Sequence, residues 1–170
     1  MIPSTRGNLH VVFGPPASGK TVYARALAAE TGACLLDSDE VTERMVRAGL
    51  ELAGCDPDDR HSPEYRTAFR DPVYETLFDL AASNLPNVPV VIVGPFTREG
   101  GDAGWPLWLE RRLGVMPEFH FVWCAPELRR RRIIARGERR DLPKLADWEN
   151  YVSYCREMPP VFPHRFIETT

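Results

Sequence analysis

The chain lacks long apolar runs and has few cysteines. No apolar stretch of its 170 residues approaches the roughly 18 that a membrane-spanning helix needs, and the first residues lack the apolar core of a signal peptide. The four cysteines form no C-x-x-C pair and no ligand-like spacing with the four histidines. This pattern favours reduced thiols over disulfides or a zinc site. We therefore expect a cytoplasmic protein without a membrane segment.

Lysine is scarce as well. Of the 21 basic residues only Lys20 and Lys144 are lysines. A biased genome explains the excess of arginine, but it leaves the question of why position 20 is a lysine. The net charge is −3. A weak negative charge argues against a protein coated in nucleic acid, although a local basic groove stays open.

Apolar runs of strand length alternate with segments of helical periodicity. The predicted strands are residues 9–13, 34–36, 88–93, 119–124 and 165–169. The predicted helices are residues 21–30, 41–52, 65–85 (with a break near Pro72), 126–136 and 142–155. Alternation of this kind is typical of βαβ units. The sequence therefore predicts one α/β domain over residues 1–170, with a five-stranded, mostly parallel sheet covered by helices on both faces.

A glycine-rich segment lies between the first predicted strand and the first predicted helix. Residues 14–21 match G-x-x-x-x-G-K-[ST] at every fixed position. Gly14 and Gly19 permit a backbone whose N–H groups curl around phosphate oxygens, and the helix N-terminus adds partial positive charge. Lys20 can bridge the β- and γ-phosphates, and the Thr21 hydroxyl can ligate Mg²⁺. The alternative is a chance glycine-rich turn.

The segment predicts an ATP site with Mg²⁺. Its expected nucleotide-binding residues are Gly14, Pro15, Pro16, Ala17, Ser18, Gly19, Lys20 and Thr21. No guanine-recognition motif follows a predicted strand, which disfavours a GTPase, although the preference for ATP over GTP stays open.

Two carboxylates follow the second predicted strand. Alternate residues of an extended chain point the same way, so Asp37 and Asp39 are expected to face the phosphate site together. One carboxylate can take the proton of an attacking hydroxyl, and the other can hold Mg²⁺. The alternative is a structural role in which Ser38 or Asp39 caps the next helix.

Arginines cluster before the last predicted helix. Arg132 and Arg136 are neighbours on one helix face, and Gly137 releases the chain into a loop. Arginines on a closing lid, about residues 129–142, can clamp a phosphoryl group in transfer. Residues 129–131, all arginines, are expected on a solvated face, and a nucleic-acid patch is a third interpretation.

The acceptor region is expected at residues 41–70 and 97–113. Trp105 and Trp108 could stack on an acceptor ring, although helix packing against the core is the favoured alternative. Four arginines could neutralise an anionic acceptor or lie on the surface: Arg44, Arg47, Arg66 and Arg70.

With these segments placed, the chain resembles small AAA-type P-loop kinases, the group of polynucleotide 5′-hydroxyl kinases, chloramphenicol phosphotransferase, gluconate and shikimate kinases and zeta-type toxins. Residues 14–21 match their nucleotide loop, and residues 38–40 resemble the acidic motif whose aspartate contacts the acceptor hydroxyl. Residues 132–137 are similar to the R-x-x-x-R-G lid. The resemblance implies a three-layer P-loop NTPase fold with a small lid.

The resemblance also assigns roles. It implies transfer of the γ-phosphate of ATP to a hydroxyl of a small molecule or a nucleic-acid 5′ end, with nucleic acid less favoured. Asp39 would be the base and Asp37 a magnesium ligand with Thr21. The catalytic residues would be Lys20, Asp39, Arg132 and Arg136. Several relatives carry an aspartate after the third strand, where this chain has Gly94 instead.

Two other functions stay open at this point. One is an ATP-binding regulatory module without transfer, and the other is a zeta-like toxin that phosphorylates a nucleotide sugar. The acceptor, and whether the protein is a monomer or a homodimer, also stay open.

Overall fold

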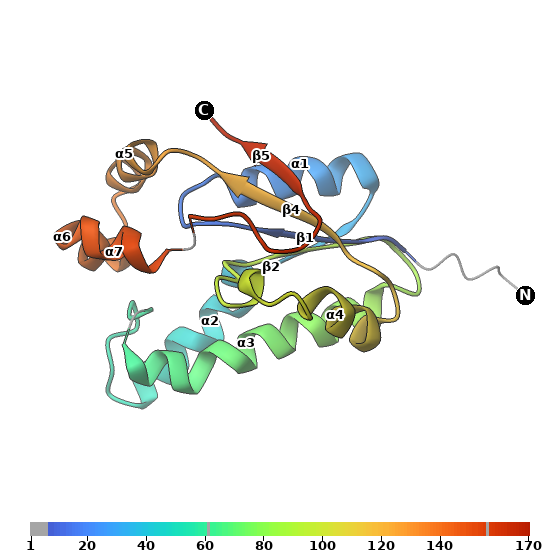
Figure 1. Ribbon diagram of the computed structural model, residues 1–170. Helices are drawn as coiled ribbons and strands as arrows, with labels where there is room; N and C mark the ends of the chain where they lie inside the picture. The colour runs from blue at the N-terminus through green and yellow to red at the C-terminus, as the bar shows by residue number, and fades with distance from the viewer. Residues whose placement is uncertain (1–6, 61, 156) are drawn as a thin grey trace, which may run out of the picture.

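A five-stranded parallel sheet forms the centre of the computed structural model, which describes residues 7–60, 62–155 and 157–170. The strands are β1 (Leu9–Phe13), β2 (Cys34–Asp37), β3 (Val90–Val93), β4 (Glu118–Trp123) and β5 (Arg165–Glu168). Their order across the sheet is β2-β3-β1-β4-β5, and each pair of neighbours is parallel (Figure 1). The predicted α/β fold is confirmed, and the sheet is parallel throughout rather than mostly parallel.

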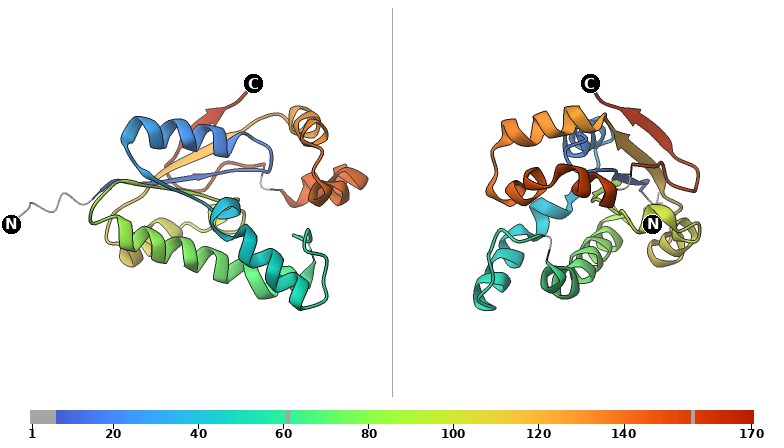
Figure 2. Two further views of the ribbon diagram at one scale, coloured as in Figure 1. Left: turned by 180° about the vertical axis from the view of Figure 1, so that it is seen from behind. Right: turned by 60° about the vertical axis from the view of Figure 1, so that its left-hand side comes forward.

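Helices cover both faces of this sheet, which gives three layers. Helix α1 (Lys20–Thr31) lies on one face, and α2 (Ser38–Leu52), α3 (Pro63–Asn84) and α4 (Trp105–Leu113) lie on the other (Figures 1 and 2). Beyond the carboxyl ends of the strands lie the remaining helices, α5 (Pro126–Arg136), α6 (Leu142–Ala146) and α7 (Trp148–Tyr154). Two 3₁₀ turns, η1 (Glu99–Gly101) and η2 (Arg139–Asp141), complete the described elements.

The side chains of β1 divide between the two faces. Leu9, Val11 and Phe13 pack into the cluster beneath α3 and α4, whereas Val12 packs with Ala24 of α1. Because helices cover both faces, the central strands are buried along their whole length, and this explains their continuous apolar runs. Among the described residues, no helix combines the length and the apolarity needed to cross a bilayer.

Of the two tryptophans of α4, Trp105 is buried in the core, and Trp108, 43 % exposed, packs against the edge of the core. The Trp105 side chain is 4 % exposed, and its ring centroid lies 5.1 Å from that of Phe96 and 5.3 Å from that of Phe119. Trp108 packs edge-on against Phe78. Neither side chain lines the cleft described below, so the hypothesis that they stack on an acceptor is wrong, and the packing alternative holds.

Two helix predictions are wrong: one predicted break is absent, and one helix predicted as continuous is interrupted. Helix α3 runs through Pro72 without interruption, because burial of side chains such as Leu77 and Phe78 outweighs the one backbone hydrogen bond that a proline removes. The predicted helix over residues 142–155 is instead two helices. Asp147 leaves helical geometry between them, and its carboxylate accepts a hydrogen bond from the Asn150 N–H and so caps α7.

Candidate nucleotide and acceptor site

The loop between β1 and α1 has the shape that its glycines permit. Gly14 has φ +144°, and a Cβ there would lie 2.1 Å from the Val122 carbonyl oxygen of β4. Gly19 and Ala17 also have positive φ, at +95° and +58°. Within the described chain, the buried Ser18 Oγ has no hydrogen-bond partner. The loop is therefore a curled cradle, packed closely against β4, with an unused polar group.

Lys20 is the first residue of α1 and folds back over this loop. Its Nζ donates a hydrogen bond to the Pro15 carbonyl oxygen over 2.7 Å. Burial lowers the pKa of Lys20 to about 8, although the negative charges of Asp39 and Asp37 oppose this shift. A phosphate near Nζ would favour the protonated amine, because opposite charges stabilise each other in a partly buried site.

Asp37 joins the loop to the neighbouring strand and helix. Thr21 Oγ1 donates to Asp37 Oδ2 over 2.8 Å, and the Asp39 N–H donates to Asp37 Oδ1 over 3.0 Å. Burial raises the pKa of Asp37, while the hydrogen bond from Thr21 opposes the shift. Asp37 therefore caps α2, and the prediction that Ser38 or Asp39 is the cap is wrong.

Asp39 lies in the first turn of α2 and not on an extended strand. Helix α2 begins at Ser38, three residues earlier than predicted, so the alternation argument for Asp37 and Asp39 is wrong. Both side chains nevertheless line the same cleft as Lys20. The Asp39 carboxylate is 68 % exposed, and its Oδ2 lies 3.6 Å from Arg140 Nη1.

The two arginines that the lid prediction singles out have different partners. Arg132 Nη1 donates to Thr169 Oγ1 over 2.9 Å and to the Ala17 carbonyl oxygen of the loop over 3.3 Å. Arg136 instead donates to Asp141, through Nε over 2.9 Å and through Nη2. Both arginines line the cleft. Arg132 thus already touches the phosphate loop, whereas Arg136 is bound to a carboxylate.

Asp141 holds the segment after α5, and the sequence reasoning missed it. Its carboxylate is 1 % exposed and also accepts from Lys144 Nζ over 2.6 Å. Burial opposes ionisation of this carboxyl group, but Lys144 and Arg136 outweigh burial, so the pKa of Asp141 is lowered. Two basic residues of the cleft wall are therefore fixed by one buried carboxylate.

Arg129 is not on a solvated face, and that prediction is wrong. Its side chain is fully buried, pairs with Glu157 and lies over the Trp148 ring of α7, with 5.9 Å from Cζ to the ring centroid. Position 129 faces α7, which the sequence of α5 alone does not reveal. Arg130 and Arg131 are exposed, as expected.

One cleft of about 830 Å³ lies at the carboxyl ends of β1, β2 and β3, and Lys20, Asp37, Asp39, Arg132 and Arg136 all line it. Segment 41–70 contributes a wall that includes Thr42, Tyr65, Arg66 and Arg70. Arg44 and Arg47 do not line the cleft, and Arg47 pairs with Asp58 instead. Eight basic and four acidic side chains line it: Lys20, Arg60, Arg66, Arg70, Arg132, Arg136, Arg140 and Lys144 against Asp37, Asp39, Glu43 and Asp147.

No acid replaces the missing aspartate after β3. Gly94 lines the cleft, and a Cβ at this position would lie 2.9 Å from the ring of Phe96. Phe96 itself is fully buried with φ +39°. The Phe96 ring therefore occupies the space next to Gly94, and a side chain at residue 94 does not fit there unless the ring shifts.

Comparison with known proteins agrees with this geometry. A family model described as an AAA domain matches residues 9–158, so the chain belongs to this family. Its fold is that of small P-loop kinases. No curated protein sequence matches the chain.

Three solved structures illustrate the likeness of fold. A putative kinase from Chloroflexus aurantiacus J-10-fl is 21 % identical, with a TM-score of 0.69 over 96 % of this chain and 85 % of that one. A gluconokinase from Sinorhizobium meliloti 1021 is 17 % identical, with a TM-score of 0.58 over 95 % of this chain and 81 % of that one. A shikimate kinase from Acinetobacter baumannii in complex with shikimate is 20 % identical, with a TM-score of 0.54 over 98 % of this chain and 86 % of that one.

Replacement of Asp141 by asparagine should loosen the segment that it holds. Asp141→Asn weakens three charge-assisted hydrogen bonds, two from Arg136 and one from Lys144. Each is worth about 1.5–3 kcal/mol, so amide hydrogens of residues 139–146 should exchange at least about tenfold faster. The matched control is Glu138→Gln, a half-exposed carboxylate of the same segment, which should have a smaller effect.

The difference between wild type and Asp141→Asn should also depend on pH. Because the pKa of Asp141 is lowered in the folded protein, its stabilisation is present above about pH 4 and is lost as the pH falls through the folded-state value. Equal exchange rates of the two proteins at neutral pH would show that Asp141 does not hold this segment.

Proposed function

We propose that the protein transfers the γ-phosphate of ATP to a hydroxyl group of an anionic small molecule. The observation that carries the proposal is the shared cleft: the phosphate loop, Asp39 and eight basic side chains all line one cavity. A protein that only binds nucleotide needs neither a carboxylate such as Asp39 in the same cleft as the phosphate loop nor a basic wall beside it.

The donor groups of the loop fit MgATP. Gly14, Ala17 and Gly19 curl the backbone into a phosphate cradle. The Thr21 hydroxyl and the Asp37 carboxylate are the hard oxygen ligands that Mg²⁺ prefers. When bound, Mg²⁺ supplies positive charge to the phosphate oxygens. Thr21 and Asp37 would hold it, and Lys20 would contact the β- and γ-phosphates.

Asp39 is the proposed general base. The acceptor oxygen would form a bond to the γ-phosphorus while the bond to ADP breaks, and its proton would pass to Asp39. The large exposed fraction of this carboxylate leaves it accessible to a substrate hydroxyl. Arg140, 3.6 Å away, holds the carboxylate at the cleft wall.

The two lid arginines would act differently. Arg132 already contacts the loop through the Ala17 carbonyl, so it can stabilise charge on the phosphoryl group from its present position. Arg136 would have to exchange Asp141 for a phosphate oxygen, which links its action to movement of the proposed lid, about residues 129–142.

The charge of the cleft favours an anionic acceptor. The whole chain carries a net charge of −3, yet basic side chains outnumber acidic ones twofold around the cleft. Most of these basic groups have carboxylate partners, for example Arg70 with Glu99 over 2.7 Å. Arg66 forms no ion pair with any described residue, and it faces the cleft from α3. We therefore assign it to the acceptor's negative charge.

Asp39→Asn should separate transfer from binding. Asparagine keeps the size of the side chain but does not accept a proton at neutral pH, so phosphoryl transfer should fall by about 10²–10⁴-fold while ATP affinity stays the same. The measurement is transfer of labelled γ-phosphate to a panel of hydroxyl compounds, including sugar acids, nucleosides, oligonucleotide 5′ ends and nucleotide sugars.

The control for this variant is Glu40→Gln, which removes a carboxylate from the same helical turn without touching the cleft. Its transfer rate should stay within about twofold of wild type. Full transfer by Asp39→Asn would rule out the base, and tight ATP binding without transfer to any compound by the wild type would favour a sensing module.

Arg66→Ala tests the acceptor charge separately. Loss of a charge-assisted contact worth about 1.5–3 kcal/mol should raise the KM for the preferred acceptor by about 10–100-fold, with the KM for ATP unchanged. Arg44→Ala, an exposed arginine outside the cleft, is the control and should change neither constant. A neutral preferred acceptor, or equal effects of the two variants, would contradict the anionic acceptor and leave phosphoryl transfer intact.

A further inference from the structure

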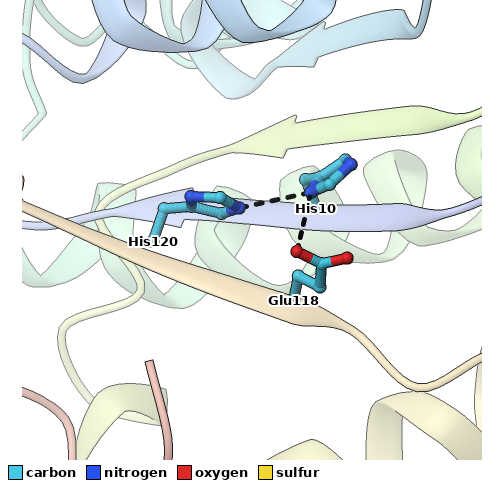
Figure 3. Close-up of side chains that lie close together, drawn as sticks. All are labelled: His10, Glu118 and His120. Atoms are coloured by element: carbon cyan, nitrogen blue, oxygen red, sulfur yellow. Dashed lines mark hydrogen bonds and ion pairs between the residues drawn. The ribbon is translucent and has the colours of Figure 1, made fainter. Parts of the chain in front are cut away.

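A second polar cluster lies on the sheet away from the nucleotide cleft. It consists of His10 of β1 with Glu118 and His120 of β4 (Figure 3). The strand register pairs His10 with Glu118, and His120 follows two residues later on the same face of β4. Both histidines are buried, at 5 % and 0 % exposure. Strand pairing, and not spacing along the chain, brings the three side chains together.

The three donor atoms of this cluster lie close enough to converge on one metal ion after a small movement of the Glu118 side chain. His10 Nδ1 lies 3.2 Å from His120 Nε2 and 3.9 Å from Glu118 Oε2, and the three donor atoms all lie within 4.8 Å of one another. Tetrahedral Zn²⁺ with bonds of about 2.0–2.2 Å keeps its ligand atoms roughly 3.3–3.5 Å apart. We propose that His10, Glu118 and His120 bind a divalent transition-metal ion of the zinc type.

Tyr23 of α1 provides the outer hydrogen bond that metal-binding histidines usually have. Its hydroxyl lies 2.8 Å from His120 Nδ1. If Nδ1 carries the proton and donates it to Tyr23, the lone pair of Nε2 points toward His10 and Glu118. The Tyr23 hydroxyl can accept this proton, so the contact is compatible with the tautomer of His120 that offers Nε2 to a metal.

The side chains of this cluster are incompletely paired by one another. The two rings share one N–H···N contact, His10 Nε2 has no partner among the described residues, and 3.9 Å is too long for a hydrogen bond from His10 to Glu118.

Glu118 forms the solvent-exposed side of the cluster, whereas the two histidines are buried. Glu118 is half-exposed and also lies 3.3 Å from Arg165 of β5, which competes with the ion for the carboxylate. Imidazole ligands suit zinc-type ions, whereas Thr21 and Asp37 offer only the oxygen donors that suit Mg²⁺. No residue of the cluster lines the nucleotide cleft, so this site stands independently of the proposed kinase function. An ion here would tie β1 to β4 and, through Tyr23, to α1.

Titration with Co²⁺ tests the site, because Co²⁺ substitutes for Zn²⁺ and its visible absorption reports coordination. The full chain should bind one Co²⁺ with the spectrum of a four- or five-coordinate ion and without the near-ultraviolet band of thiolate ligation. Glu118→Gln and Tyr23→Phe, both at partly exposed positions, should keep the fold and weaken Co²⁺ binding at least about tenfold. Glu127→Gln, an exposed glutamate on α5, is the matched control and should bind like wild type.

Three results would overturn the proposal. The first is the absence of Co²⁺ binding at micromolar concentration, and the second is a thiolate band, which would place the ion on a cysteine. The third is binding that Asp37→Asn abolishes and Glu118→Gln leaves unchanged, which would place the ion in the nucleotide cleft.

Discussion

The hydrogen bond between Thr21 and Asp37 connects the parts on which the site depends. Thr21 stands at the start of α1, directly after the phosphate loop, and Asp37 ends β2. The second carboxylate oxygen of Asp37 caps α2 through the Asp39 N–H. One buried carboxylate therefore fixes the position of the loop relative to the helix that carries Asp39. On our proposal the same two oxygen ligands hold Mg²⁺, so the nucleotide and the base would share one anchor.

The opposite wall of the cleft is held by a second buried carboxylate. Asp141 binds Arg136 and Lys144, while Arg132 reaches the loop on its own. The cleft thus has one arginine in contact with the phosphate loop and another bound to a buried carboxylate. On our proposal, phosphate and Asp141 would be alternative partners for Arg136, and this competition would make the proposed lid respond to nucleotide.

Much of this arrangement can be predicted from the sequence, because the patterns that indicate it are local. The residues of the phosphate loop have a fixed spacing between a strand and a helix, and buried parallel strands appear in the sequence as continuous apolar runs. Predictions fail where contact with another element determines the position of a residue. Asp39 falls on a helix because Asp37, the last residue of β2, also caps α2, so the helix begins directly after the strand. Arg129 is buried because α7 packs over it. The pairing of His10 with Glu118 depends on strand register, which no spacing along the chain reveals.

Mn²⁺ binding to the ADP complex, followed by electron paramagnetic resonance, tests the anchor most directly. Asparagine caps a helix about as well as aspartate, so Asp37→Asn should keep α2 in place while removing a charged metal ligand. The account predicts that Asp37→Asn weakens Mn²⁺ binding at least about tenfold, with metal-free ADP binding unchanged. Asp147→Asn, another acid of the cleft wall, should bind Mn²⁺ like wild type. Equal Mn²⁺ affinity in wild type and Asp37→Asn would contradict the account.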